Sequence, residues 1–182
     1  RAPVEFVRGE GQGIFALYDQ GQPVAWFAHR RVREKPPSGG VSVVCESVPV
    51  DPQLQEYARR LLSHANWHGV AMVEFKVTPA GRPYVIEVNG RFWGSLQLAV
   101  DAGVDFPSML YNVALGHRVA PISDYRVGAR SRWLLGDFDH LYLVLKDRDR
   151  SYGAVTKLQA LARFLNFFDR HTRFEVNRWD DI

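Results

Sequence analysis

Within residues 69–95, the stretches 72–77 and 84–89 alternate in the direction of their side chains with a period of two, which predicts two β-strands. Residues 79–82 between them contain proline and glycine and predict a four-residue hairpin loop. Alternation sends apolar side chains to one face of the hairpin and acidic, basic and amide side chains to the other. We therefore expect one face to join the core and the other to carry chemistry.

The expected register of this hairpin brings two carboxylates together. With Thr78 facing Pro83, counting outward places Glu74 directly opposite Glu87. Opposed like charges destabilise a sheet by up to roughly 1 kcal/mol, so the pair requires a proton, a basic partner or a cation. Asn89 follows one pleat further on and completes a set of hard oxygen ligands, which suits Mg²⁺ or Mn²⁺.

The remaining pattern predicts an α+β fold, in which a mainly antiparallel sheet is covered by helices. Apolar runs bounded by turn residues predict further strands at 4–7, 14–18, 23–28, 41–44 and 127–135. Helical spacing and capping signals predict helices at 51–69, 95–103, 107–116 and 155–168, with a short one beginning at Asp137. We expect one domain at 1–120 and a C-terminal extension of strand and helices at 121–182, which packs on it and carries no chemistry.

A basic run at 29–35 is followed by a loop of proline, serine and glycine at 36–40. A solvated strand end with an exposed linker is one interpretation of this pattern. The other is an anion-binding loop, in which guanidinium groups and backbone N–H groups meet phosphate or substrate carboxylate oxygens. The residues assigned to such a loop are Arg30, Arg31, Arg33, Ser38, Gly39 and Gly40.

Composition limits the class of protein. With 182 residues, of which 46% are hydrophobic, the chain is long enough for a packed core. No apolar run approaches the length of a membrane span and the first residues lack a signal peptide, so we expect a cytoplasmic protein with no membrane partner. A net charge of +3 and a pI of about 9.2 suit an anionic ligand.

The cysteine and histidine residues give weaker signals. Cys45 is the single cysteine and lies in an apolar, strand-like run, which favours a buried and inert thiol. His64 and His68 have the spacing of a helical metal pair, but no acidic or cysteine ligand joins them. A role near the helix C-terminus, where positive charge is favourable, is the better interpretation.

The hairpin residues resemble the ATP-grasp superfamily, specifically the C-terminal part of its ATP-grasp domain. The matching pattern is E…E-x-N-x-R, and the sequences at 27–42 and 73–107 look most like the carboxylate-amine ligase branch related to carbamoyl-phosphate synthase. The resemblance implies that Glu74, Glu87 and Asn89 hold the Mg²⁺ ions that bridge the ATP phosphates.

The same resemblance implies roles for further residues. Arg91 occupies the place of the family's catalytic arginine, which reaches the transferred phosphate or acyl phosphate. The first expected strand corresponds to the hinge whose backbone reads adenine, so Glu5 and Val7 are nucleotide-binding candidates. Gln12 stands near the ribose contact, where relatives often have an acidic residue, and Lys76 stands where many relatives place an apolar residue against adenine.

The implied activity is that of an ATP-dependent carboxylate-amine or carboxylate-thiol ligase. A substrate carboxylate attacks the γ-phosphate of ATP, and an amine or another nucleophile captures the resulting acyl phosphate. The implied partners are ATP, a small carboxylate and a nucleophile. Assembly into an oligomer is compatible with the resemblance. Because the chain begins at the hinge, we expect missing N-terminal segments of the same protein to supply the phosphate-contacting lysine and glycine-rich loop. The isolated chain is then expected to bind ATP weakly and to turn nothing over.

Three alternatives compete with this interpretation. A nucleic-acid or phosphate-binding module would use the basic run with Trp26 and Trp67, but the acidic cluster would interrupt its basic face, which argues against nucleic acid. A degenerate ATP-grasp relative would serve only as a scaffold. In the third alternative, Glu74 and Glu87 bind no metal and only form surface ion pairs with Lys76, Arg82 or Arg91.

Overall fold

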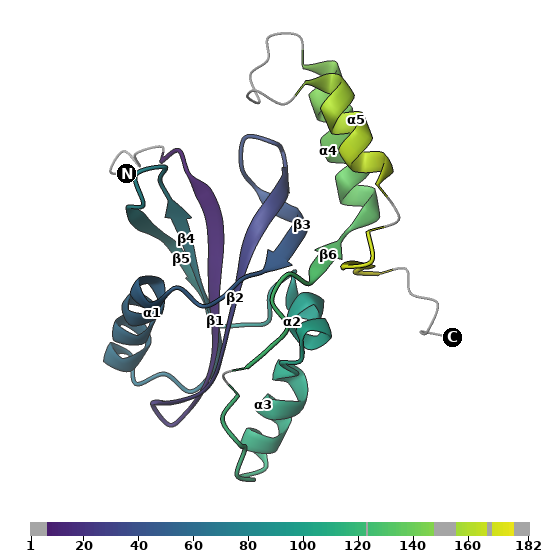
Figure 1. Cartoon of the computed structure of the whole chain (residues 1–182). Helices are drawn as coiled ribbons and strands as arrows, with labels where there is room; N and C mark the ends of the chain where they lie inside the picture. The colour runs from purple at the N-terminus through teal and green to yellow at the C-terminus, as the bar shows by residue number, and fades with distance from the viewer. Residues whose placement is uncertain (1–6, 123, 148–155, 167–168, 177–182) are drawn as a thin grey trace.

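A computed structural model describes residues 7–122, 124–147, 156–166 and 169–176. Within these ranges a seven-stranded sheet runs through the molecule in the order β5-β4-β1-β2-β3-β6-β7, and all neighbours are antiparallel except β6 and β7 (Figure 1). The α+β prediction with a mainly antiparallel sheet is therefore confirmed. The strands are β1 (Glu10–Asp19), β2 (Gln22–Lys35), β3 (Val41–Ser47), β4 (Gly69–Val77), β5 (Pro83–Asn89), β6 (Arg130–Arg132) and β7 (Thr172–Phe174). The helices are α1 (Pro52–His64), α2 (Leu96–Ala102), α3 (Phe106–Ala114), α4 (Leu134–Lys146) and α5 (Lys157–Leu165).

The sheet forms a middle layer between helices. One face packs against α1, and the other packs against α2 and α3. Side chains along β1 point alternately to the two faces of the sheet. Phe15 joins the core cluster under α2 and α3, whereas Ile14 joins the cluster under α1. The expected division of the hairpin into a core face and a chemical face was too simple. On the side of α2 and α3, Met72 belongs to the core, and Glu74 lines a cavity only two residues later.

The β4–β5 hairpin places Glu74 opposite Glu87, as predicted, but reaches this register by a different route. Its loop has one more residue than expected, so that Val77 pairs with Pro83. A β-bulge next to Glu74 then leaves Ile86 as an extra residue on β5. The two one-residue shifts cancel at the carboxylates, which therefore still face each other.

Strand β2 is longer than predicted and includes the whole basic run. It pairs with β3 as far as Lys35, with irregular register around Arg33. The basic run is thus an ordered strand end and not an exposed linker. The loop that follows closes locally, because the backbone N–H of Gly39 donates to the carbonyl of Pro36 at 3.0 Å.

Capping aspartates account for the starts of α1 and α3. Asp51 caps α1 as predicted, since its Oδ1 accepts from the backbone N–H groups of Gln53 and Leu54. Asp105 caps α3 in the same way. None of the helices in the described ranges is long and apolar enough to cross a membrane.

The two ends of the chain depart most from the predicted pattern. Residues 4–6 of the first expected strand lie outside the described residues, and Val7 is not part of a strand. The strand expected at 127–135 is reduced to β6, because α4 begins at Leu134, ahead of the predicted start at Asp137. Strand β7, which the pattern did not predict, pairs with β6 and extends the sheet.

Candidate functional site

The predicted metal ligands converge on a cavity of about 540 Å³ beside the β4–β5 hairpin. Strand register explains the convergence, because Glu74 and Glu87 are directly paired and Asn89 follows on the same face of β5. Arg91 also lines the cavity, just beyond the end of β5. The other wall comes from distant segments, with Arg31 of β2, Gly40 and Ser42 near the start of β3, Trp133 before α4, and Glu175 after β7.

The buried member of the carboxylate pair has a basic partner. Glu74 is 7% exposed, and Arg31 donates from Nη2 to its Oε2 at 2.5 Å. Burial raises the pKa of Glu74 above its usual value; Arg31 opposes this shift and the facing Glu87 adds to it. The two opposed carboxylates need a neutralising group between them, and Arg31 supplies it.

Arg31 also fixes the loop on the far side of the cavity. Its Nη1 donates to Glu34 Oε1 at 2.9 Å and to the carbonyl of Gly40 at 2.8 Å. With Glu74, this single guanidinium joins three segments of the chain. Its geometry suits a residue that positions the carboxylate, and its donors are already engaged by protein groups.

The exposed members of the set are arranged differently. Asn89 donates from Nδ2 to Glu87 Oε1 at 2.6 Å, which holds the amide beside the carboxylate. Arg91 is exposed and donates from Nη1 to the carbonyl of Phe92. Among the described residues, no group of three His, Cys, Asp or Glu side chains is placed to bind a metal ion. The set fits a hard cation only with Asn89 as the third oxygen donor beside the two carboxylates.

Three of the predicted nucleotide contacts, Val7, Gln12 and Lys76, are not among the residues that line this cavity. Glu5 is outside the described residues, and Val7 is half-buried ahead of β1. Gln12 lies on β1 and donates to Glu10 Oε2. Lys76 Nζ lies 3.5 Å from Glu34 Oε2, and a Cβ on Gly39 would be 3.8 Å from the same nitrogen. Lys76 therefore adjoins the 36–40 loop and does not line the carboxylate cavity.

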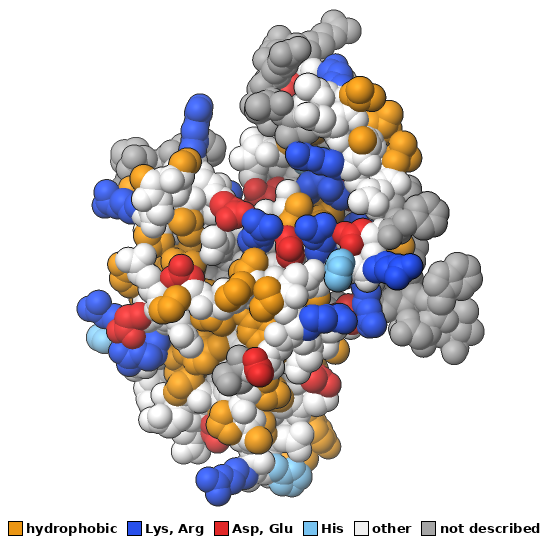
Figure 2. Space-filling view, in the orientation of Figure 1, with side chains coloured by type: hydrophobic (Ala, Val, Ile, Leu, Met, Phe, Trp, Pro, Cys, Tyr) orange, Lys and Arg blue, Asp and Glu red, His pale blue; other side chains and the backbone are white. Residues whose placement is uncertain are grey.

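The residues predicted to bind phosphate or substrate do not gather in one site. Arg30 pairs with Glu46 at 2.9 Å, and Arg33 pairs with Asp137 at 2.6 Å. Of the 36–40 loop, Gly40 lines the carboxylate cavity, whereas Ser38 and Gly39 are not among its lining residues. Each arginine of the basic run thus forms an ion pair with a different carboxylate. Figure 2 shows basic and acidic side chains mixed in one band across the upper part of this face, above a largely apolar area.

This arrangement gives little support to a nucleic-acid module. Such a module needs unpaired cations on one face, but the arginines of the basic run hold carboxylates. Trp26 and Trp67, the proposed stacking platforms, pack against the core cluster under α1.

The sequence pattern missed a buried pair in the cavity wall. His29 is 3% exposed, and its Nδ1 lies 3.0 Å from Ser95 Oγ. Burial, aided by the nearby Arg31, lowers the pKa of His29 to about 3, so the ring is neutral. Ser95 was expected to cap α2, but it makes no capping hydrogen bond and meets the histidine instead. No sequence signal joins two residues that lie 66 positions apart.

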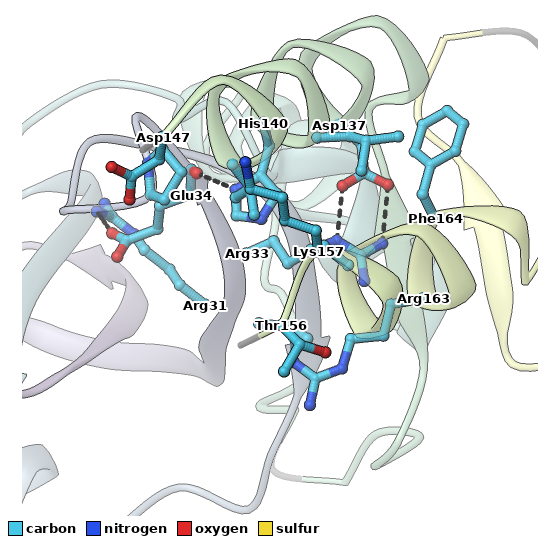
Figure 3. A pocket seen from close by; sticks show the side chains of 15 residues that line it. Arg31, Arg33, Glu34, Asp137, His140, Asp147, Thr156, Lys157, Arg163 and Phe164 are labelled. Atoms are coloured by element: carbon cyan, nitrogen blue, oxygen red, sulfur yellow. Dashed lines mark hydrogen bonds and ion pairs between the residues drawn. The ribbon is translucent and has the colours of Figure 1, made fainter. Parts of the chain in front are cut away.

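The C-terminal extension, which was expected to carry no chemistry, contains a buried charged cluster that the sequence pattern did not predict. Asp137 is 1% exposed and accepts hydrogen bonds from Arg33 and Arg132. Arg33 and Asp137 line a second cavity, of about 460 Å³, between β2 and the helices α4 and α5 (Figure 3). Arg31 and Glu34 line it as well, so the two cavities are neighbours.

Known proteins share both sequence and fold features with this chain. The model of the family described as ATP-grasp in the biosynthetic pathway with Ter operon matches residues 8–135. No curated protein matches the chain in sequence.

Several solved structures share the fold at low sequence identity. The ATPase subunit of phosphoribosylaminoimidazole carboxylase from Aquifex aeolicus is 18% identical, with a TM-score of 0.59 over 69% of this chain and 40% of its own. Biotin carboxylase from Campylobacter jejuni, in a β,γ-ATP complex, is 17% identical, with a TM-score of 0.56 over 69% of this chain and 30% of its own. Pyruvate carboxylase from Rhizobium etli is 20% identical, with a TM-score of 0.57 over 70% of this chain and 13% of its own. The chain thus spans less than half the length of each of these proteins.

Proposed function

Because the chain belongs to the family of ATP-grasp proteins in the biosynthetic pathway with the Ter operon, we propose that it forms the metal-binding side of an ATP-dependent ligase site. The observation that carries this proposal is the convergence of Glu74, Glu87, Asn89 and Arg91 on one cavity. Paired carboxylates with a neighbouring amide are a ligand set for Mg²⁺ or Mn²⁺. A purely structural role would not require the buried Glu74 to face a second carboxylate.

The residues have separate roles in this proposal. Glu74, Glu87 and Asn89 would hold the cation, and a bound Mg²⁺ would neutralise charge on the ATP phosphates. Arg91 is exposed at the same cavity, where its guanidinium would donate to oxygens of the transferred phosphoryl group or of the acyl phosphate. Arg31 would keep Glu74 oriented through its contact with Oε2.

The reaction proposed for the whole protein is ligation of a carboxylate with an amine, or with a thiol. A carboxylate oxygen forms a bond to the γ-phosphorus of ATP while the β–γ bridging bond breaks and ADP leaves. The nucleophile then attacks the acyl carbon of the acyl phosphate, loses a proton and displaces inorganic phosphate. Glu5 and Val7 would contact adenine, whereas the phosphate-contacting lysine and the glycine-rich loop would come from other segments of the same protein. The chain alone would bind ATP weakly.

Metal binding by the chain itself tests the ligand assignment. We expect Mn²⁺ titrated into the 182-residue protein to bind, as followed by loss of the free-ion electron paramagnetic resonance signal. Glu87→Gln should weaken this binding by roughly tenfold or more, because it removes a charged ligand. Glu56→Gln on α1, also an exposed glutamate, is the matched control and should bind as the wild type does. Wild-type affinity in Glu87→Gln would show that the metal assignment is wrong.

The reaction class needs a protein that contains the complete nucleotide site. With ATP, Mg²⁺ and a carboxylate, hydroxylamine should trap the acyl phosphate as a hydroxamate, while ADP is released in equal amount. Glu87→Gln should abolish both products. ADP release without hydroxamate, whichever carboxylate is supplied, would contradict the ligase proposal.

A further inference from the structure

The second cavity is formed by two parts of the chain, of which one lies inside the range matched by the family model and the other mostly outside it. One wall is the basic end of β2, which lies within the range that the family model matches. The other wall is formed by α4 and α5, most of whose residues follow position 135, where that match ends. Figure 3 shows the side chains of both walls pointing into the space between them. A ligand of this cavity would therefore be specific to proteins that carry the helical extension.

Asp137 binds two arginines at one end of the cavity. Arg33 donates to both Asp137 oxygens, from Nε at 2.6 Å and from Nη2 at 2.8 Å, and Arg132 Nε donates to Oδ2 at 2.7 Å. The side chains of Asp137 and Arg132 are 1% and 2% exposed. Both Asp137 oxygens are thus engaged by guanidinium groups, so this carboxylate is neutralised by arginines at this end of the cavity.

Two guanidinium groups present donors that the described residues do not use. Arg33 binds Asp137 through Nε and Nη2, and Figure 3 shows its third nitrogen turned away from the carboxylate. Arg163 of α5 lines the same cavity, is exposed, and has no hydrogen bond or ion pair within the described ranges. Guanidinium N–H groups that converge on a pocket are suited to carboxylate or phosphate oxygens.

The other acidic residues of the cavity lie away from Arg33 and Arg163. Figure 3 shows Glu34 and Asp147 on the side away from Asp137 and Arg163. Glu34 is already paired with Arg31 at 2.9 Å and faces Lys76 Nζ at 3.5 Å. The cationic end of the cavity therefore remains separate from the acidic end.

Part of the cavity wall is apolar. Leu141 and Val144 of α4 and Ala160 of α5 form a buried cluster, and Phe164 packs against it. All four side chains line the cavity. A ligand that fits would combine an anionic group with an apolar body of small size.

We propose that this second cavity binds a small organic anion, whose carboxylate or phosphate meets Arg33 and Arg163 and whose apolar part lies on Leu141, Val144 and Phe164. The proposal goes beyond the ligase function and does not rest on it. The paired carboxylates and Arg91 do not line this cavity, and Arg31 is the one described residue that lines both cavities.

Probes of matched size test the proposal by isothermal titration calorimetry on the 182-residue protein. We expect 3-phenylpropionate or phenyl phosphate to bind, and the tighter of the two identifies the preferred anionic group. The neutral 3-phenylpropan-1-ol and inorganic phosphate should each bind at least roughly tenfold more weakly, because each lacks one of the two interactions. Equal binding of the alcohol, or no binding of either organic anion at 10 mM (roughly the weakest affinity of interest), would overturn the proposal.

Variants locate the binding. Arg163→Met should weaken the anion about tenfold, and because Arg163 is exposed and unpaired within the described ranges, the fold should persist. Arg60→Met on α1, another exposed arginine, should bind as the wild type does. Glu87→Gln should also leave the anion affinity unchanged, which separates this site from the proposed metal site. An unchanged affinity in Arg163→Met would overturn the proposal.

Discussion

Arg31 reaches across 43 positions of sequence to hold Glu74, with Nη2 2.5 Å from Oε2. Both side chains are largely buried, at 13% and 9% exposed. The same arginine binds Glu34 and the Gly40 carbonyl, so the contact ties the hairpin that bears the paired carboxylates to the loop on the far side of the cavity.

Removal of this contact should destabilise the fold. Arg31→Met leaves Glu74 buried opposite Glu87 without a basic partner, and we expect a loss of about 3 kcal/mol in the free energy of unfolding, measured with urea. The double variant Arg31→Met with Glu74→Gln should recover part of the loss, because no unpaired charge is then buried. Losses that simply add in the double variant would show that the two residues do not interact.

The buried His29 should make stability depend on pH. Its pKa is about 3 in the folded protein and about 6.5 when exposed, so only the unfolded chain takes up a proton between these values. Stability should therefore be unaffected above pH 6.5 and should fall as the pH drops below it, by up to roughly 4–5 kcal/mol at pH 3.

Urea unfolding of His29→Gln at several pH values from 4 to 8 checks this. The variant should show a shallower fall than the wild type, whereas His117→Gln, which changes an exposed histidine, should retain the full dependence. An identical pH profile in His29→Gln and the wild type would mean that His29 is not the group responsible.

Arg91 should matter for turnover and not for folding. Its side chain is exposed and binds only a neighbouring carbonyl, so Arg91→Met should unfold at the same urea concentration as the wild type. In a protein with the complete nucleotide site, hydroxamate formation should fall by roughly 10²-fold, since one donor to the transferred group is lost. Arg82→Met, which changes an exposed arginine at the other end of β5, serves as control, and equal rates in both variants would remove Arg91 from the catalytic set.

Asp137 should be essential for the packing of the extension. Asp137→Asn would remove the charged carboxylate that Arg33 and Arg132 both bind in a buried site, at an expected loss of about 3–5 kcal/mol in unfolding free energy. Asp139→Asn on the same helix removes a half-exposed ion pair to Lys35 and should change stability far less. A small loss in both variants would contradict the view that the Asp137 cluster holds α4 on β2.

The paired carboxylates could be predicted because their geometry is local. Glu74, Glu87 and Asn89 lie on one hairpin, and strand alternation places them on one side once the register is known. Even there the loop length was wrong by one residue, and the prediction succeeded because the bulge at Ile86 compensates. Helix starts such as Asp51 were predictable for the same reason, since a cap acts on the next three residues.

The long-range half of the site could not be predicted in this way. The partner of Arg33 lies 104 positions away on α4, and the partner of His29 lies 66 positions away before α2. Neither spacing follows from a helical or strand period. The three arginines of the basic run looked equivalent in sequence, and the structure gives each a different carboxylate.

The sequence by itself determined the α+β class, the hairpin and the pairing of Glu74 with Glu87, because each depends on hydrogen bonds and alternation between neighbours in the chain. Only the tertiary structure decided which charges neutralise one another. Burial in a medium of low polarity makes an unpaired charge costly, so the packing of β2 against β4 and α4 selects Arg31 for Glu74 and Arg33 for Asp137.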